Sequence, residues 1–217
     1  MLKLDPNLLF FGNLVDGSGR LNELEQFREY MNSFLLREKT YFEEAHVDLR
    51  QEFVPLFAET FPPILHSSII ISTAILIEQE MRGYCGALID ALNLKLKFND
   101  LSGTVLERLR TLVTKVAQLE LDPVEVRWDD TVALFEIRNC LVHAGGQLTE
   151  FQRASTVRAF AARYGTPACA DTFMSIDSKT SDLALQIASD FLDGIYGIVL
   201  KRFPGHHRSS RRRRSTV

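Results

Sequence analysis

Apolar residues recur every three or four positions along most of the chain, which is the pattern of amphipathic helices. Clusters of glycine, proline, asparagine and aspartate separate the periodic stretches, so each stretch has its own start and stop signals. The pattern predicts an all-α bundle with helices over residues 21–60, 64–92, 104–119, 128–144, 150–162 and 181–203. One very short β element is expected near residues 172–176.

Turn and cap signals set the expected limits of several helices. Pro55 is expected to end or kink the first helix, and Pro62-Pro63 to close it. The break at Asn99–Gly103 has cap chemistry, and Thr180 or Ser181 is expected to cap the last helix.

One helical domain is expected over residues 21–203, which contain no internal repeat and no linker between two cores. Residues 1–20 are rich in turn formers and predict a loosely structured lead-in. Residues 204–217 have almost no apolar side chains and predict a disordered basic tail. With 217 residues, 46% of them hydrophobic, the chain is long enough for one sizeable core.

The almost continuously apolar run Ile69–Ile77 predicts a central, buried helix. The longest uncharged stretch, residues 61–77, also contains two prolines, a histidine and several hydroxyl side chains. That stretch is too short and too polar for the roughly 20 apolar residues of a membrane span. The three cysteines are widely spaced and form no Cys-x-x-Cys pair, which is typical of reduced thiols. We therefore expect a soluble, cytoplasmic protein without membrane association.

Charge is distributed unevenly along the chain. The formal net charge is −3, but residues 201–217 hold seven positive and no acidic residues, so the remainder holds 18 basic against 28 acidic residues. A run of arginines without apolar neighbours suits contacts to a phosphate backbone. The alternatives are a solvated tail and a tail that folds back on the acidic body. The arginines expected to bind nucleic acid are Arg208, Arg211, Arg212, Arg213 and Arg214.

The helix expected over residues 128–144 ends in the sequence Arg-Asn-Cys-Leu-Val-His-Ala-Gly-Gly, residues 138–146. Two glycines stop a helix effectively, so its end is expected after Ala144. The helical period also gives this segment two apolar faces, which indicates packing on both sides. One face holds Leu134, Ile137, Cys140, Leu141 and Ala144, and the other holds Val132, Phe135 and Val142.

The polar residues of this segment suggest chemistry on RNA. Asn139 and His143 are four residues apart and can share one pocket, while Arg138 converges on them only through the reach of its side chain. An imidazole can take a proton from a 2′-hydroxyl or return one to a leaving oxygen. A guanidinium can hold phosphate oxygens where negative charge builds up.

The Arg-Asn start and the histidine five residues after Arg138 resemble the R-x(4–6)-H motif of HEPN domains, and the resemblance covers roughly residues 64–146. It implies an all-α bundle that works as a homodimer through this helix, with Arg138 and His143 catalytic and Asn139 supporting. It also implies metal-independent RNA cleavage that leaves a cyclic phosphate. An acidic residue on the earlier helix often faces the arginine in such families, and Glu78 is the first candidate here, before Glu80.

The same resemblance implies a role in toxin–antitoxin systems or antiphage defence, with an antitoxin or a nucleotidyltransferase as a partner. The alternative for the motif is structural, with Arg138 in an ion pair with Glu78 or Glu80 and His143 as a simple hydrogen-bonding group. Glu78 also precedes Arg82 by four residues, so an ion pair within one helix is a further alternative.

Other candidate sites are incomplete. Glu43-x-x-His46 and Cys140-x-x-His143 are each half of a metal site, and neither has a second half in the sequence. His66 is expected to be a satisfied polar residue. No metal or cofactor is therefore expected.

The leading hypothesis is a HEPN-type, metal-independent endoribonuclease that acts on RNA as a homodimer. The alternative is a non-catalytic helical dimer that binds nucleic acid or a protein partner through the same helix and the arginine tail.

Overall fold

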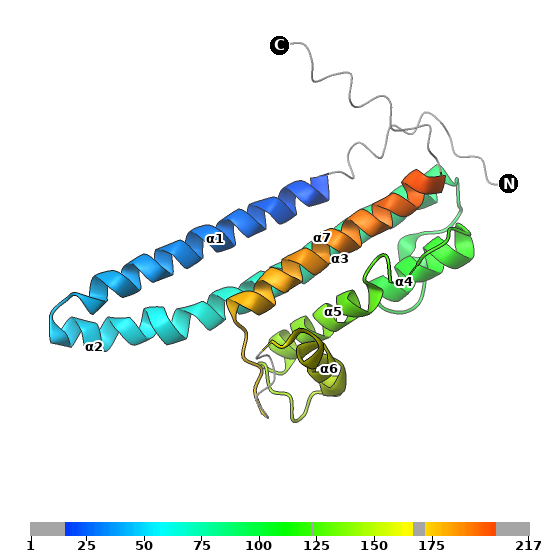
Figure 1. The fold of residues 1–217 in the computed structure, drawn as a ribbon. Coiled ribbons are helices and arrows are strands. Elements are labelled where there is room, and N and C mark those ends of the chain that lie inside the picture. The colour runs from blue at the N-terminus through cyan, green and yellow to red at the C-terminus, as the bar shows by residue number, and fades with distance from the viewer. Residues whose placement is uncertain (1–15, 123, 167–171, 203–217) are drawn as a thin grey trace, which may run out of the picture. The chain divides into compact units, whose positions relative to one another are not determined.

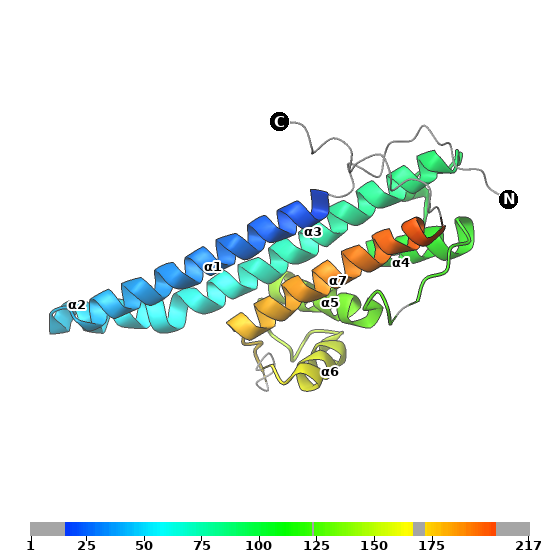
Figure 2. The same ribbon diagram turned by 45° about the horizontal axis from the view of Figure 1, so that its top comes forward.

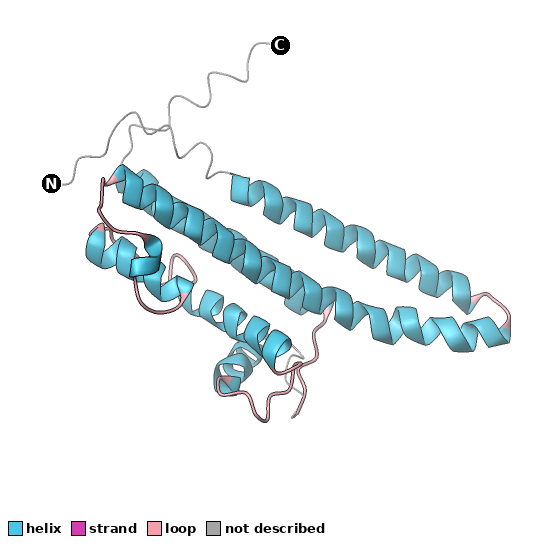
Figure 3. Ribbon diagram, turned by 180° about the vertical axis from the view of Figure 1, so that it is seen from behind, coloured by secondary structure: helices cyan, strands magenta, loops and turns pink. Residues whose placement is uncertain are grey.

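The computed structural model describes residues 16–122, 124–166 and 172–202, which form helices and no strand (Figures 1 and 3). The all-α prediction is confirmed. The elements are α1 (Asp16–Glu43), α2 (Val47–Pro55), the π-helical turn η2 (Leu56–Thr60), α3 (Phe61–Ala91), the 3-10 turn η3 (Phe98–Asp100), α4 (Val105–Thr111), the π-helical turn η4 (Leu112–Val116), α5 (Trp128–His143), α6 (Ala154–Tyr164) and α7 (Ser178–Arg202).

Contacts between residues group the chain into two compact units. One unit comprises the described parts of residues 1–19, 76–129 and 189–217, and the other comprises residues 20–75 and 130–188. The boundaries fall inside α1, α3, α5 and α7, so these helices contribute to both units. A single domain over residues 21–203 stays a prediction.

The first predicted helix is two helices in the structure. Helix α1 already begins at Asp16, so residues 16–20 are helical, contrary to the expected loose lead-in, and residues 1–15 lie outside the described part. The chain then turns at residues 44–46, and α2 runs back beside α1 (Figures 1 and 2). Because no glycine or proline marks this turn, the sequence pattern gave no signal for it.

Helices α1 and α2 form a helical hairpin, and α2 continues through η2 into α3 as its second arm. Prolines in this second arm widen a helical turn but do not end the helical stretch. Helix α2 ends at Pro55 and the chain continues through the π-helical turn η2 into α3, so Pro55 marks an irregularity as expected, whereas the expected end at Pro62-Pro63 is wrong. In η2 the N–H of Phe61 donates to the carbonyl of Leu56, a bond five residues long. Pro62 and Pro63 have no N–H for the carbonyls four residues before them, and a widened turn makes room for their rings.

Aromatic side chains hold the two arms of the hairpin together. The ring of Phe42 stacks on those of Phe53 and Phe57, with centroids 4.7 and 5.6 Å apart. The rings of Phe34 and Phe61 meet Phe57 edge-on. Although α2 and η2 contain no buried residue, these offset and edge-to-face pairs each contribute about 0.5–1.5 kcal/mol beyond their burial.

The predicted burial of the second helix is confirmed for one face of the run Ile69–Ile77, in which Ile75 is 40% exposed. In α3 the side chains of Ile69, Ile70 and Ile77 are at most 1% exposed. By length and composition the continuous stretch Val47–Ala91 is apolar enough to cross a membrane, but 44% of its most apolar window is buried inside the structure. A core helix of a soluble protein passes the same test, so this single helix is weak evidence for a membrane.

Side-chain caps define where α4 and α7 begin. Thr104 caps α4 in a reciprocal capping box with Glu107, as the predicted break suggested, but the helical region ends at Val116, before residue 119. At α7 the cap is Asp177, whose Oδ1 accepts from the backbone N–H of Thr180 at 2.8 Å. The expected cap at Thr180 or Ser181 is therefore wrong, because an aspartate three residues earlier satisfies that N–H.

The short β element expected at residues 172–176 is reduced to one antiparallel bridge between Phe173 and Gln147. With only one residue pair engaged, the segment does not continue as a strand.

His66 is a buried, satisfied polar residue, as expected. Its side chain lies 3.0 Å (Nδ1 to Oγ) from Ser181, which donates its own hydrogen to the carbonyl of Ser178. Nδ1 therefore carries the hydrogen of the shared bond. Burial lowers the pKa of His66, Asp177 opposes this shift, and the cation of Arg28 adds to it.

We predict that this histidine makes the protein less stable in mild acid. In the unfolded chain the imidazole takes up a proton near pH 6.5, whereas in the folded state it does so only at a lower pH. The neutral imidazole therefore contributes to the free energy of unfolding above about pH 6.5, and this contribution is lost as pH falls toward the folded-state pKa. Chemical denaturation of the wild type and His66→Gln at several pH values measures the effect, with the exposed His46→Gln as the control. Parallel pH profiles for all three proteins would contradict the prediction.

Candidate functional site

The helix that carries the predicted site ends where the glycines suggested. Helix α5 stops at His143, and Gly145 takes a left-handed conformation with φ of +57°. The N–H of Gly146 then donates to the carbonyl of Cys140 at 3.0 Å, which is the long bond of a Schellman-type end. With this conformation the chain leaves the helix within two residues after His143.

A second set of backbone bonds fixes the loop after α5. The N–H of Met174 donates to the carbonyl of Gly146, and the N–H of Leu148 to that of Thr172, both at 2.8 Å. The thiol of Cys140 lies 3.7 Å from the carbonyl of Gln147. The C-terminal end of α5 is thus held in a defined conformation, which suits a site whose side chains must keep their positions.

The two apolar faces of α5 differ in burial. Leu134, Ile137 and Cys140 are completely buried. On the second face Val132 and Phe135 are half-buried, and Val142 is 45% exposed. This second face therefore keeps accessible apolar surface at the end that carries the polar motif.

The structure joins two of the predicted site residues directly. Nη1 of Arg138 donates to Oδ1 of Asn139 at 3.1 Å, and both side chains are half-buried. His143 lies at the last position of α5 and is exposed. Since the two residues are about 140° apart around the helix, Arg138 and His143 of one chain point in different directions.

Glu78 has a local partner. Its Oε1 accepts from Nη2 of Arg82 at 2.8 Å, which is the ion pair within one helix that the sequence left open. Glu80 accepts from the hydroxyl of Tyr196 at 3.0 Å. A role for Glu78 beside Arg138 stays a prediction. The five tail arginines, residues 208 and 211–214, lie outside the described residues.

A polar cluster that the sequence reasoning missed lies at the start of α5. The carboxylate of Asp130 is buried and accepts from Nη1 of Arg163 at 2.7 Å and from the hydroxyl of Tyr164 at 2.5 Å. These contacts tie the start of α5 to the end of α6. The only sequence signal for Asp130 was an acidic residue in the first turn of a helix, which is common.

The segment that begins with the motif is more basic than residues 1–200 taken as a whole. Residues 138–166 contain four arginines and one acidic residue, whereas residues 1–200 carry 18 basic and 28 acidic residues. The arginines in this segment are Arg138, Arg153, Arg158 and Arg163. Arg163 is paired with Asp130 at the other end of α5, and the remaining excess of positive charge in this segment favours a polyanionic ligand.

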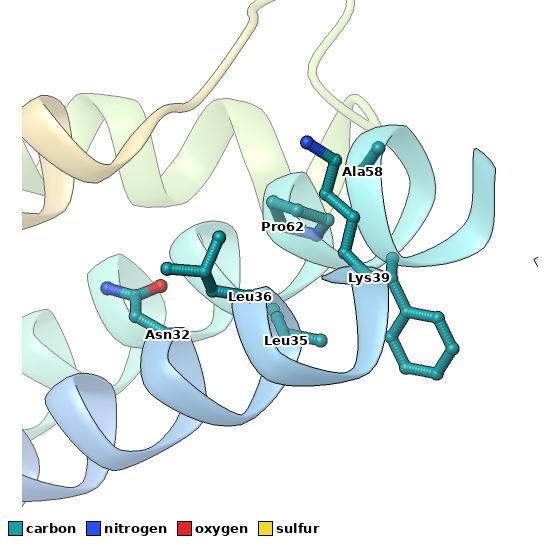
Figure 4. A pocket seen from close by; sticks show the side chains of 7 residues that line it. Asn32, Leu35, Leu36, Lys39, Ala58 and Pro62 are labelled. Atoms are coloured by element: carbon teal, nitrogen blue, oxygen red, sulfur yellow. The ribbon is translucent and has the colours of Figure 1, made fainter. Parts of the chain in front are cut away.

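A shallow groove of about 210 Å³ lies between α1 and the segment formed by η2 and the start of α3 (Figure 4). It is smaller than the roughly 300–1,000 Å³ of small-molecule sites, and none of the motif residues line it. The lining residues are Asn32, Leu35, Leu36, Lys39, Phe57, Ala58 and Pro62.

Reactive side chains elsewhere are poorly placed for chemistry. Burial raises the pKa of the Cys85 thiol to about 12, so the sulfur stays protonated and is a poor nucleophile. Within residues 16–122, 124–166 and 172–202, no three His, Cys, Asp or Glu side chains gather as ligands of a metal ion would. The half-sites at Glu43-His46 and Cys140-His143 are therefore not completed by described residues.

Comparisons with protein-family models, with curated proteins and with solved structures gave no significant match. The HEPN resemblance therefore stays a prediction that rests on the residues of α5.

We predict that Asp130→Ala lowers the free energy of unfolding by about 2 kcal/mol, because it removes two charge-assisted hydrogen bonds from a buried carboxylate. Denaturant unfolding measures the loss. The matched control is Asp129→Ala, since Asp129 is exposed and occupies the same first turn of α5. Equal losses in both variants would mean that the helix end, and not the contact with α6, carries the effect.

Proposed function

We propose that the protein is a HEPN-type endoribonuclease that needs no metal ion and acts as a homodimer on RNA. The observation that carries this proposal is the arrangement at the end of α5, where Arg138 is anchored by Asn139 and His143 is exposed. The excess of arginines over acidic residues in residues 138–166 supports a polyanionic substrate. A role in toxin–antitoxin or defence systems, with an antitoxin or a nucleotidyltransferase as partner, belongs to the same proposal.

Each residue has a distinct part in the proposed reaction. The imidazole of His143 takes the proton of the 2′-hydroxyl that attacks the adjacent phosphorus, or returns a proton to the departing 5′-oxygen. The guanidinium of Arg138 donates to the non-bridging oxygens, where negative charge increases in the transition state. Asn139 is a positioning residue, since its carbonyl oxygen holds the guanidinium in place. The products are a 2′,3′-cyclic phosphate and a free 5′-hydroxyl.

A homodimer brings together arginine and histidine side chains that point apart within one chain. Within one chain Arg138 and His143 point to different sides of α5. The two side chains of one chain are therefore poorly placed to contact the same phosphate. A two-fold axis beside α5 brings Arg138 of one copy near His143 of the other. The accessible apolar side chains of Val132, Phe135 and Val142 supply the contact surface for this pairing.

We predict that His143→Ala abolishes RNA cleavage while leaving the fold intact. The expected loss is about 10²–10⁴-fold, the usual contribution of a general acid or base. The assay is cleavage of labelled total RNA or tRNA by purified protein in EDTA, and circular dichroism checks the fold. The exposed His46→Ala is the matched control, because it removes an imidazole at the α1–α2 turn.

Cleavage by the wild type and His46→Ala alone would support the proposal. Equal cleavage by the wild type and His143→Ala would reject His143 as the catalytic group. Failure of every protein to cleave, together with RNA binding, would favour the non-catalytic helical dimer.

We further predict that Arg138→Lys reduces cleavage about a hundredfold although the charge is kept. A lysine has no planar fork with which to bind Asn139 and a phosphate at once. Steady-state kinetics should show the loss mainly in kcat, because the interaction strengthens in the transition state. Arg153→Lys, at an exposed arginine on the N-terminal side of α6, is the control. A purely raised KM in Arg138→Lys would assign this arginine to RNA binding only.

A further inference from the structure

Exposed large apolar side chains concentrate on the hairpin formed by α1, α2, η2 and the start of α3. Eight of the twelve in the described residues lie between positions 27 and 64. Scattered exposed apolar residues are normal, but a local concentration marks an interaction surface. These eight are Phe27, Tyr30, Leu36, Tyr41, Val47, Leu49, Phe61 and Ile64.

Part of this surface has the spacing of a coiled-coil seam. Five side chains on α1 are separated by three, four, three and four residues, which keeps them in one line along the helix. We define the α1 seam as Phe27, Tyr30, Phe34, Arg37 and Tyr41. Phe27, Tyr30 and Tyr41 are 50%, 69% and 67% exposed. The seam lies on a different side of α1 from the buried Leu21 and Leu35, and only Phe34 at its centre is partly covered, by the edge of the Phe57 ring.

The single charge of the seam is held over an aromatic ring. The guanidinium of Arg37 lies 5.3 Å from the ring centroid of Phe34, and its Nε also contacts Glu38 at 3.3 Å. An arginine in this position can stack on a ring of the same chain or on an equivalent ring of another chain.

Two hydroxyl side chains on the seam's outer flank are already hydrogen-bonded within α1. Gln26, Ser33 and Thr40 line this flank of α1. The hydroxyl of Ser33 donates to the carbonyl of Glu29, and that of Thr40 to the carbonyl of Leu36, at 2.9 and 3.0 Å. Covering Ser33 and Thr40 therefore leaves neither hydroxyl hydrogen without a partner.

We propose that the α1 seam binds the α1 seam of a second copy of this chain in antiparallel orientation. In this orientation Arg37 of each copy lies against Phe34 of the other, and Tyr30 lies against Tyr41. A parallel pair would instead place Arg37 against Arg37, where like charges repel. The seam's own charge pattern thus selects the antiparallel arrangement.

Charge argues for a protein partner over a membrane or a nucleic acid. Residues 21–60 contain nine acidic and four basic residues. A net negative charge repels anionic lipid headgroups and phosphate backbones. A second copy carries the same net charge, but the residues that meet in the seam are aromatic rings and one cation, Arg37, so the acidic side chains are not part of the contact itself.

The area available fits a dimer that depends on concentration. An aromatic side chain buries about 200 Å², so four partly exposed rings from each copy bring the pair to about 1,000 Å². That is the low end of specific interfaces, where association is weak and reversible. The seam is separate from the outer face of α5, so this proposal does not depend on the proposed ribonuclease activity.

The first test is sedimentation velocity of the full chain over a range of concentrations, comparing the wild type with Tyr30→Glu/Tyr41→Glu. The wild type should associate, and the variant's dissociation constant should rise at least about tenfold. Leu36→Glu/Ile64→Glu is the matched control, because it places two new charges at exposed apolar positions of the same hairpin outside the seam. Circular dichroism should be the same for all three.

Several results would overturn the proposal. A monomeric wild type, or unchanged association of Tyr30→Glu/Tyr41→Glu, removes its basis. Loss of association in Val142→Glu but not in the seam variant assigns the self-contact to α5.

Cross-linking tests the orientation. In a Cys169→Ser background, where Cys85 and Cys140 are buried, Tyr30→Cys and Tyr41→Cys proteins are oxidised separately and as a mixture. Antiparallel pairing should give disulfide-linked dimers mainly in the mixture. Efficient linkage within each single variant would show parallel pairing and reject the proposed arrangement.

Discussion

Burial of the apolar face of α3 is the constraint on which the other helices depend. This helix supplies fully buried isoleucines to both compact units, and each such side chain stabilises the fold by about 1.5–3 kcal/mol. Three polar side chains of its N-terminal half do not oppose that burial, because they are hydrogen-bonded, whereas the buried hydroxyl of Tyr84 has no partner among the described residues. The hydroxyls of Ser68 and Thr73 donate to carbonyls one turn earlier, and His66 shares a hydrogen with Ser181. The residues that made this stretch too polar for a membrane span are thus compatible with a protein core.

The sequence predicted helix ends well wherever a single residue type imposes the local conformation. Gly145 requires a positive φ that other residues adopt at a cost, and Thr104 with Glu107 forms a complete capping box within four residues. The turn at residues 44–46 has no such residue and depends on aromatic rings that meet across the hairpin. Pro62 and Pro63 misled the prediction because the widened π-helical turn before them makes room for their rings.

For the candidate site, too, the sequence predicted positions along a helix but not contacts between helices. Helical periodicity placed Arg138, Asn139 and His143 at the end of one helix, and the structure adds the hydrogen bond that anchors the arginine. Asp130 had no comparable signal, because its partners Arg163 and Tyr164 are 33 and 34 residues away on α6. Pattern reasoning detects contacts within a helix turn, as for Glu78 and Arg82, whereas contacts between helices depend on the packing.

The hairpin also shows why a second copy suits this chain. Ordering a residue costs about 1–2 kcal/mol of backbone entropy, and α2 with η2 orders fourteen residues without burying one completely. The stacked phenylalanines offset part of that cost on the inner side of α1. On its outer side Phe27, Tyr30 and Tyr41 of the α1 seam remain largely in water, where they contribute little. Pairing of two seams removes these rings from water and gives each Arg37 a second aromatic surface, so the hairpin gains in a dimer the burial that a single chain does not provide.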